Sequence, residues 1–170
     1  MRQIASILLT AIFLSSTIPG CLSEFRGEIT LVVNYEKTNG TMVESYIDGE
    51  HISTKNVSLE FDFSNTESER KLVEFGVEFA AGRDPVSVDS DTTSTVTVEF
   101  ADHGIYEIVA YAIDENNRRE STIVTIRIDL SIEWSEQSTH QPSDLSINPI
   151  PKYGGPHPVV IFIDSMVENP

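Results

Sequence analysis

The sequence has little cysteine, little positive charge and no long apolar run, and each shortage narrows the class of protein. A single cysteine in 170 residues excludes an intrachain disulfide. The 11 lysines and arginines stand against 27 aspartates and glutamates, which gives a net charge of −16. Such a surface repels phosphate backbones, so nucleic acid is not expected as a partner.

Signatures of catalysis are missing as well. The chain has no Gly-x-Ser-x-Gly elbow, no phosphate-binding loop and no dinucleotide fingerprint. Its four histidines are isolated and lack the spacing of metal ligands: His51, His103, His140 and His157. We therefore expect no enzyme activity and no cofactor, and we assign no catalytic residue.

The apolar stripe of a helix is absent after residue 20, whereas apolar and polar residues alternate along much of the chain. The alternation is clearest in residues 104–128, where two runs flank a polar tip at residues 114–117. This is the pattern of a β-hairpin. The residues of the first run that are expected to face the core are Tyr106, Ile108, Ala110 and Ala112.

Other alternating runs predict strands at residues 29–35, 42–47, 57–63, 73–79 and 96–100. Asn39 and Gly40 give the strongest short turn signal, because both residues tolerate a positive φ. We therefore expect the strand after them to pair back on the strand before them. Several short strands with polar turns and no helix predict an all-β fold, an antiparallel β-sandwich with Greek-key links.

The first 20 residues have the layout of a secretory signal peptide. Arg2 supplies a positive charge, residues 4–14 are apolar apart from two hydroxyl residues, and residues 15–20 are small and polar with a proline. The apolar run is shorter than the ~20 residues that span a bilayer. Cys21 follows directly, and residues 21–27 would form a short tether after cleavage.

The segment that ends at Cys21 resembles the lipobox of prokaryotic lipoproteins, whether bacterial or archaeal. Ile18 and Gly20 match that pattern, and Pro19 replaces the usual small residue. The resemblance implies that the thiol of Cys21 carries a lipid. It also implies export and a membrane-anchored position at the cell surface.

Residues 100–117 resemble the closing half of a PKD domain. In that family an aromatic strand end leads into a Gly-x-Tyr strand and an Asp-rich turn. Gly104 and Tyr106 fall on the glycine and the tyrosine of this motif, and Asp114 falls on its turn acid.

Residues 75–82 resemble the Tyr-x-Trp-Asp-Phe-Gly-Asp-Gly stretch of the same family. Val77 replaces the tryptophan, and Ala80 and Ala81 replace a glycine and an aspartate. The resemblance covers roughly residues 57–128 and also fits the broader group of Ig-like sandwiches. It implies an extracellular PKD-like or Ig-like module that acts as a spacer or contacts proteins and glycans, without catalysis.

These observations divide the chain into four parts. Residues 1–20 are the signal peptide, 21–27 the tether, 28–130 the sandwich and 131–170 a Pro- and Gly-rich C-terminal stretch. Residues 159–163 are an apolar run fit for a buried strand. This run either adds to the sandwich or begins a second β module that the sequence truncates.

Two kinds of loop residue are candidate sites. Asp84, Asp89 and Asp91 offer the hard oxygen ligands that calcium prefers, although their spacing is not that of an EF-hand. Asn39 and Asn56 begin glycosylation sequons. The alternative interpretations are solvated acidic loops and ordinary turn chemistry.

The sequence thus predicts a lipid-anchored surface module that acts in adhesion, binding or spacing, with other surface proteins or glycans as partners. One alternative is a surface lipoprotein that captures solutes or glycans in an open groove, for which Trp134, Tyr111 and Tyr153 are the candidate aromatic residues. Another is the non-catalytic module of a larger secreted hydrolase.

Overall fold

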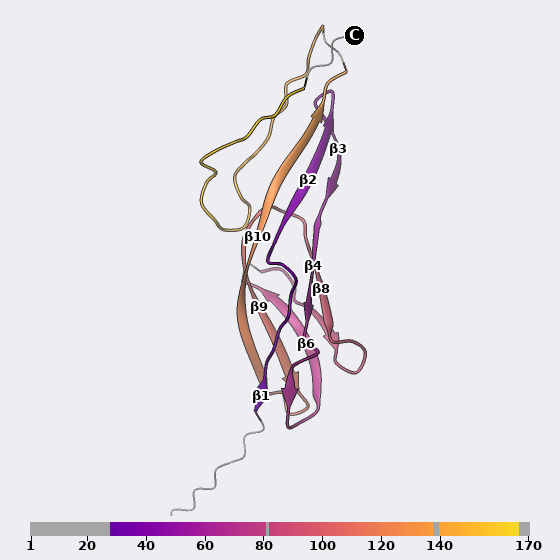
Figure 1. Ribbon diagram of the computed structural model, residues 1–170, viewed down its shortest axis with the longest axis vertical. Coiled ribbons are helices and arrows are strands. Elements are labelled where there is room, and N and C mark those ends of the chain that lie inside the picture. Colours follow the sequence, from indigo (N-terminus) through magenta and orange to yellow (C-terminus); the bar gives the residue numbers. More distant parts are fainter. Residues whose placement is uncertain (1–27, 81, 138–139, 167–170) are drawn as a thin grey trace, which may run out of the picture.

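Alternating side chains form ten strands and no helix in residues 28–80, 82–137 and 140–166, the parts of the chain that this computed structural model describes (Figure 1). Cys21, the predicted signal peptide and the predicted tether lie outside the described residues. Within them, no helix is long and apolar enough to cross a bilayer. The strands are β1 (Ile29–Thr30), β2 (Asn39–Ile47), β3 (Glu50–Lys55), β4 (Val57–Asp62), β5 (Glu67–Ser68), β6 (Leu72–Phe79), β7 (Val86–Asp89), β8 (Thr95–Phe100), β9 (Gly104–Asp114) and β10 (Arg119–Ser135).

Six of these strands form one long sheet in the order β3-β2-β10-β9-β6-β7, and β4 and β8 form a second sheet that packs against it. A third pair, β1 with β5, lies beside β4, because a bridge joins Asn34 to Asp62 at the end of β4. Every strand pairing is antiparallel except that of β2 with β10. The predicted all-β class and its antiparallel sandwich are confirmed.

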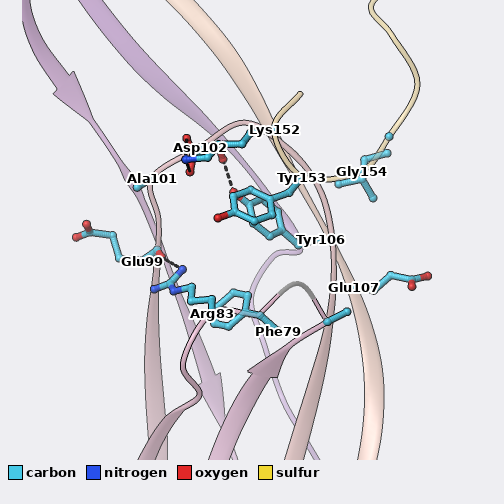
Figure 2. Close-up of a pocket in the computed structure, with 13 residues that line it drawn as sticks. Phe79, Arg83, Glu99, Ala101, Asp102, Tyr106, Glu107, Lys152, Tyr153 and Gly154 are labelled. Atoms are coloured by element: carbon cyan, nitrogen blue, oxygen red, sulfur yellow. Dashed lines mark hydrogen bonds and ion pairs between the residues drawn. The ribbon is translucent and has the colours of Figure 1, made fainter. Parts of the chain in front are cut away.

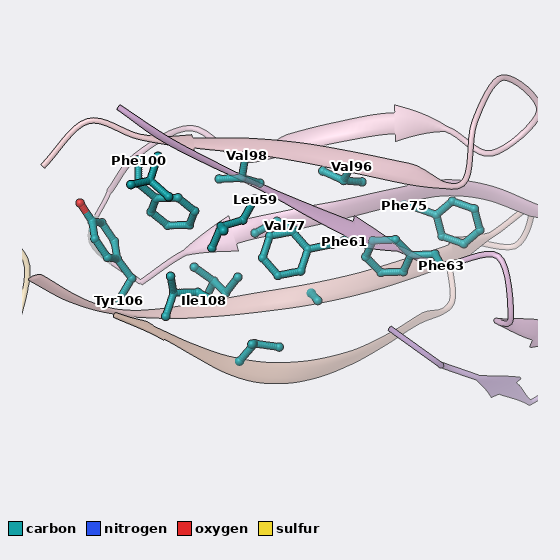
Figure 3. Packing of buried hydrophobic residues seen from close by; sticks show 14 of the residues in the cluster. Leu59, Phe61, Phe63, Phe75, Val77, Val96, Val98, Phe100, Tyr106 and Ile108 are labelled. Atoms are coloured by element: carbon teal, nitrogen blue, oxygen red, sulfur yellow. The ribbon is translucent and has the colours of Figure 1, made fainter. Parts of the chain in front are cut away.

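The hydrophobic core fills the space between the β4–β8 pair and the inner face of the long sheet (Figure 3). Large side chains that are fully buried there include Phe61, Phe63, Phe100, Ile108 and Ile126. Phe63 also stacks on Phe75, with ring centroids 5.1 Å apart. At about 25 cal/mol for each Å² of apolar surface removed from water, these aromatic residues are major contributors to stability.

The predicted hairpin at residues 104–128 is confirmed as β9 and β10, which pair along their whole shared length. Its turn is held by the buried Asp114, whose Oδ1 accepts hydrogen bonds from the amides of Asn116 (2.8 Å) and Arg118 (2.9 Å). These bonds fix the turn because the carboxylate takes the place of a backbone partner. The inward face is as predicted, with Tyr106, Ile108, Ala110 and Ala112 all buried.

The predicted turn at Asn39 and Gly40 is wrong, because both residues belong to β2. Asn39 pairs with Arg127 of β10 in a parallel register, so β2 does not fold back on the first strand. The tight turn comes later, at Asp48 (φ 50°) and Gly49 (φ 80°), which join β2 to β3. The residue pairs Asn39-Gly40 and Asp48-Gly49 both tolerate a left-handed backbone. Because β2 pairs with β10 from Asn39 onwards, the turn forms at the second pair.

β10 belongs to two parts of the molecule. Its first half pairs with β9 in the sandwich, and from residue 129 to its end it pairs only with β2. We call β2, β3 and residues 129–135 the extension, since these strands continue past the ends of β4 and β8 (Figure 1). All six residues of β3 are exposed, so the extension has little core of its own.

The chain after β10 forms no further strand within the described residues. Residues 140–166 run beside the extension, return to the sandwich near residue 153 and then leave it again (Figure 1). The buried strand predicted at residues 159–163 is wrong: Val159 is 98% exposed and Phe162 is 93% exposed. An apolar run with two apolar faces needs a layer on each side, and no described sheet lies against it. A second module beginning there remains a prediction.

Candidate functional site

A pocket of about 640 Å³ lies at the end of the sandwich where β6 and β8 stop and β9 begins (Figure 2). Most of its lining comes from the strand ends and from the loop around Arg83. The rest comes from residues 152–155, which we call the strap. The pocket is therefore built from segments that are far apart in the sequence.

Backbone contacts dock the strap on the sandwich. The amide of Ile105 donates a hydrogen bond to the carbonyl of Tyr153 (3.0 Å), and Gly104 forms a parallel bridge with Tyr153. Gly104 has a φ of 147°, and a β-carbon there would overlap with the Tyr153 carbonyl. Gly154 has a φ of 48° and would bring a β-carbon within 2.8 Å of the Ile105 carbonyl. Glycine is therefore needed on both sides of this contact.

A stack of aromatic rings joins the strap to the core. The rings of Tyr153 and Tyr106 stack with centroids 5.0 Å apart and planes 29° apart. Phe100 meets the Tyr106 ring edge-on at 4.9 Å. Tyr106 is buried and its hydroxyl donates to the Asp102 carbonyl at 2.6 Å. Burial, and after it the charge of Asp102, raises the pKa of Tyr106 to about 12, so this hydroxyl stays protonated at neutral pH.

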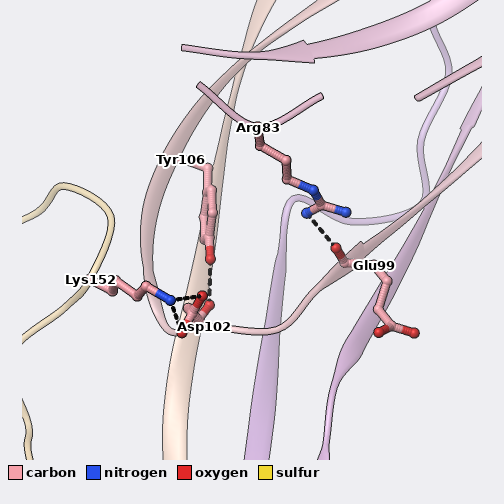
Figure 4. Close-up of polar contacts among 5 residues, drawn as sticks. All are labelled: Arg83, Glu99, Asp102, Tyr106 and Lys152. Atoms are coloured by element: carbon pink, nitrogen blue, oxygen red, sulfur yellow. Dashed lines mark hydrogen bonds and ion pairs between the residues drawn. The ribbon is translucent and has the colours of Figure 1, made fainter. Parts of the chain in front are cut away.

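Two cations lie at the pocket, each with a partner (Figure 4). Lys152 Nζ lies 3.1 and 3.3 Å from the two carboxylate oxygens of Asp102, and this hydrogen bond raises the pKa of Lys152. Arg83 donates from Nη1 to the carbonyl of Glu99 at 2.7 Å. Its guanidinium also lies 4.3 Å from the centre of the Phe79 ring. The pocket thus offers aromatic surface beside paired charges of both signs.

β7 separates Asp84 from the other two candidate calcium ligands, Asp89 and Asp91. Asp84 precedes β7, Asp89 ends it, and Asp91 follows in the turn. Lys71 Nζ lies 2.5 Å from Asp91, which raises the pKa of Lys71, as do Asp89 and Glu115 more weakly. Among the described residues, no three His, Cys, Asp or Glu side chains are grouped to hold a metal ion. The ammonium group of Lys71 supplies positive charge next to Asp89 and Asp91.

The two sequon asparagines differ in their surroundings. Asn39 is exposed at the start of β2. Asn56 is partly buried between β3 and β4, where its Nδ2 donates to Glu99 Oε1 at 2.8 Å. A glycan on Asn56 would have to replace this hydrogen bond. Use of either sequon remains a prediction, as does lipidation of Cys21, which lies outside the described residues.

Of the three aromatic residues proposed for capture, only Tyr153 lines the pocket. Trp134 is exposed near the end of β10. The prediction for Tyr111 is wrong, because Tyr111 is buried on the outer face of the long sheet. Its ring lies over Gly76, its cross-strand partner, which has no side chain to exclude it.

The outer-face cluster around Tyr111 is structural. The Tyr111 hydroxyl donates to Glu74 Oε1 at 2.6 Å, and the Arg119 guanidinium lies 4.0 Å from the ring centre. Burial and the Glu74 hydrogen bond raise the pKa of Tyr111 to about 12. Arg119 also forms two hydrogen bonds with Glu78, of 2.9 and 2.6 Å. The side chains of Tyr111, Glu74, Arg119 and Glu78 therefore provide one another's hydrogen-bond and charge partners.

Sequence reasoning missed Phe79, Arg83 and Tyr106 as pocket residues. Phe79 and Tyr106 lie on strands and pack against the core, so their periodicity carries no separate signal of a pocket. The two consecutive glycines after Tyr153 are a sequence signal of close packing, because they allow the strap to approach β9 closely.

Comparisons with known proteins find matches among solved structures. No family model matches the chain, and no curated protein matches it. Among solved structures, the chain is similar to the solution structure of the PKD domain from the KIAA 1837 protein. The match has 23% identity and a TM-score of 0.31, and it covers 43% of this chain and 72% of that domain. The protein is thus an antiparallel β-sandwich with a pocket at one end that is partly lined by the strap.

Proposed function

We propose that this protein is an exported, non-catalytic surface module, anchored through a lipid on Cys21, which spaces or attaches other surface components. The observation that carries the proposal is the long shape of the molecule. β1 lies at one end of the long axis, and residues 156–166 run towards the other (Figure 1). A lipid attached shortly before β1 would therefore hold the extension away from the membrane.

The chemistry of the pocket supports a binding role over a catalytic one. Lys152 is paired with Asp102, and the Tyr106 hydroxyl is bound to a backbone carbonyl. A nucleophile or general base needs a partner that activates it and a free path to substrate. Both groups are instead bonded to Asp102, in the loop after β8.

Lipid anchoring is tested by replacing the cysteine in the full chain. Cys21→Ser should move the protein from the membrane fraction to the medium, whereas the matched Ser23→Ala variant should stay in the membrane. Mass spectrometry of the wild-type protein should find a modified Cys21 at the mature N-terminus. A mature chain that keeps residues before Cys21, or an unmodified thiol, would contradict the proposal.

Capture of a solute is the second candidate function, and the pocket is the observation that favours it. Tyr153 and Tyr106 place two stacked rings beside groups that can donate and accept hydrogen bonds. Ligand sites commonly combine apolar walls with a few placed polar groups. Capture is compatible with lipid anchoring, since the pocket is not part of the tether.

A further inference from the structure

We propose that the strap is a clasp that releases under tension and gives the molecule a second, longer state. The inference rests on the proposed spacer function and adds a change of length to it. The clasp itself depends only on contacts within the chain, so it can be tested without the lipid.

The chain doubles back on itself after β10. Ser135 is held at the tip of the extension, where its carbonyl accepts a hydrogen bond from the Asp48 amide at 3.0 Å. Tyr153 lies back at the sandwich beside Gly104, and residues 156–166 then run towards the tip again (Figure 1). A pull on residues 156–166 away from the sandwich therefore reaches the strap before it reaches β10.

The strap is the weakest tie along this path. Its backbone contact with β9 is a single bridge, in which the Ile105 amide donates to the carbonyls of Tyr153 (3.0 Å) and Gly154 (3.4 Å). By contrast, β10 pairs with nine residues of β2 and ten of β9. A pull along β10 loads these pairings together, whereas the strap is peeled from its C-terminal end, one contact at a time.

The Tyr153 ring is the main contact that closes the clasp. It stacks on Tyr106 with ring centroids 5.0 Å apart. Phe100 and the Asp102 carbonyl hold Tyr106 in place from the sandwich. The ion pair of Lys152 with Asp102 is exposed and adds little. Because Tyr106 stays fixed in the sandwich, a released strap meets a preformed site and can close again.

Release frees a defined length of chain. Residues 136–155 are twenty residues, and they span about 70 Å when extended at about 3.5 Å per residue. Gly104, beside the strap, pairs with Ile128, and Ser135 lies seven residues further along β10. These seven residues add about 23 Å, because the point of attachment moves from the strap to the tip. The longer state should therefore reach about 90 Å further.

The test is optical-tweezers pulling of the full chain. One handle is attached through Glu115→Cys, in the exposed turn between β9 and β10, in a Cys21→Ser background. The other handle follows residue 170. The chain between the first handle and Ser135 is mostly the extended strand β10, so unfolding of the sandwich adds little length. We expect one main step, a reversible gain of about 90 Å in contour length.

An insertion identifies the origin of the step. Ten glycine and serine residues placed between Ile147 and Asn148 should lengthen the step by about 35 Å. The release force should change little, because the strap and its contacts with β9 are untouched.

Substitutions of Tyr153 test the contact that closes the clasp. Tyr153→Ala should raise the ratio of released to docked strap at a given force about tenfold, the loss expected for an aromatic pair. Tyr153→Phe is the matched control. It keeps the stacked ring and should behave like the wild type.

Three results would overturn the inference: the absence of a step, a step that the insertion does not lengthen, or a release force that Tyr153→Ala leaves unchanged. None of them affects the anchored spacer, because the Cys21→Ser fractionation reads membrane attachment alone. If the fractionation fails and the step is present, the clasp stands as a property of the chain while the anchored spacer does not.

Discussion

Tyr106 is the residue at which the core and the pocket meet. Its ring packs against Phe100 on the core side and against Tyr153 on the strap side. The sequence predicted its core role from alternation along residues 104–112, and burial of the ring confirms that prediction. Its contact with Tyr153 depends on a segment more than forty positions away, so no local pattern could indicate it.

Removal of the Tyr106 ring should destabilise the sandwich strongly. We expect Tyr106→Ala to lower the free energy of unfolding by about 3–5 kcal/mol, as for other buried aromatic truncations. Tyr106→Phe removes only the hydroxyl bond to Asp102 and should cost about 0.5–1.5 kcal/mol. Urea titrations measure both values. Near-native stability of the alanine variant would mean that the faces of β9 are assigned the wrong way round.

The two buried tyrosines should make stability fall at alkaline pH. In the folded state the pKa values of Tyr106 and Tyr111 are raised to about 12, whereas an unfolded tyrosine titrates near pH 10. Because the folded state holds these protons more tightly, their contribution is fully present below about pH 10 and is lost between about pH 10 and 12. Denaturant melts at increasing pH should show this loss. The Tyr106→Phe and Tyr111→Phe variants should each show a shallower decline than the wild type.

Gly76 is needed because the Tyr111 ring occupies the place of its side chain. Gly76→Ala should therefore cost about 1–3 kcal/mol, the usual range for overpacking. In a Tyr111→Ala background the same change should cost much less, since the ring is gone. A double-mutant cycle measures the difference. Equal costs in the two backgrounds would show that backbone effects, and not the ring, account for the loss.

At the scale of elements, the strap should open independently of the sandwich. Its contacts with β9 are few, and Gly154 needs a left-handed backbone. Gly154→Ala should speed hydrogen exchange of the Ile105 amide about tenfold, because the strain is about 1–2 kcal/mol. Lys152→Ala is the control and should change this rate little, since its ion pair is exposed. A large drop in the global melting temperature would contradict independent opening.

Local periodicity predicted the strands that bury one face. β4, β6, β8 and the β9–β10 hairpin appear where apolar residues alternate, because one face of each packs in the core. Val73 departs from the pattern of β6: the register shifts between Leu72 and Glu74, and Val73 is exposed. A bulge of this kind depends on the partner strand and is not visible in one strand alone.

Contacts between distant segments could not be predicted in the same way. Asn39 and Gly40 suit a turn, but the parallel pairing with β10 makes them part of a strand. Tyr111 alternates like an outward residue, and only the opposite Gly76 explains why it is buried. The pocket could not be predicted either, since Tyr153 reaches it from a distant Pro- and Gly-rich stretch without periodicity.

At the scale of the whole molecule, the acidic surface should make stability depend on salt. The full chain carries 11 basic residues against 27 acidic ones. Glu74 and Asp89 are direct cross-strand partners, and like charges in such pairs repel. The melting temperature should therefore rise as ionic strength approaches physiological values, where the Debye length is about 8 Å.

Calcium provides the control for that measurement. At matched ionic strength, calcium and sodium should stabilise equally, because Lys71 already lies among Asp89, Asp91 and Glu115. A much larger effect of millimolar calcium would show that these loops bind the ion, by mass action. No effect of either salt would remove the argument from charge repulsion.

The parallel pairing of β2 with β10 also sets an order of events during folding. β9 and β10 are joined by a short turn and can pair quickly, whereas Asn39 must wait for Arg127. Closing so long a loop is slow, and domains dominated by such contacts fold in milliseconds to seconds. On a chain that emerges from its N-terminus, the β2–β3 hairpin appears early and remains without its neighbour until β10 follows. The pairing of β2 with β10 is then the last part of the sheet to form, and a chain cut before residue 127 would lack it.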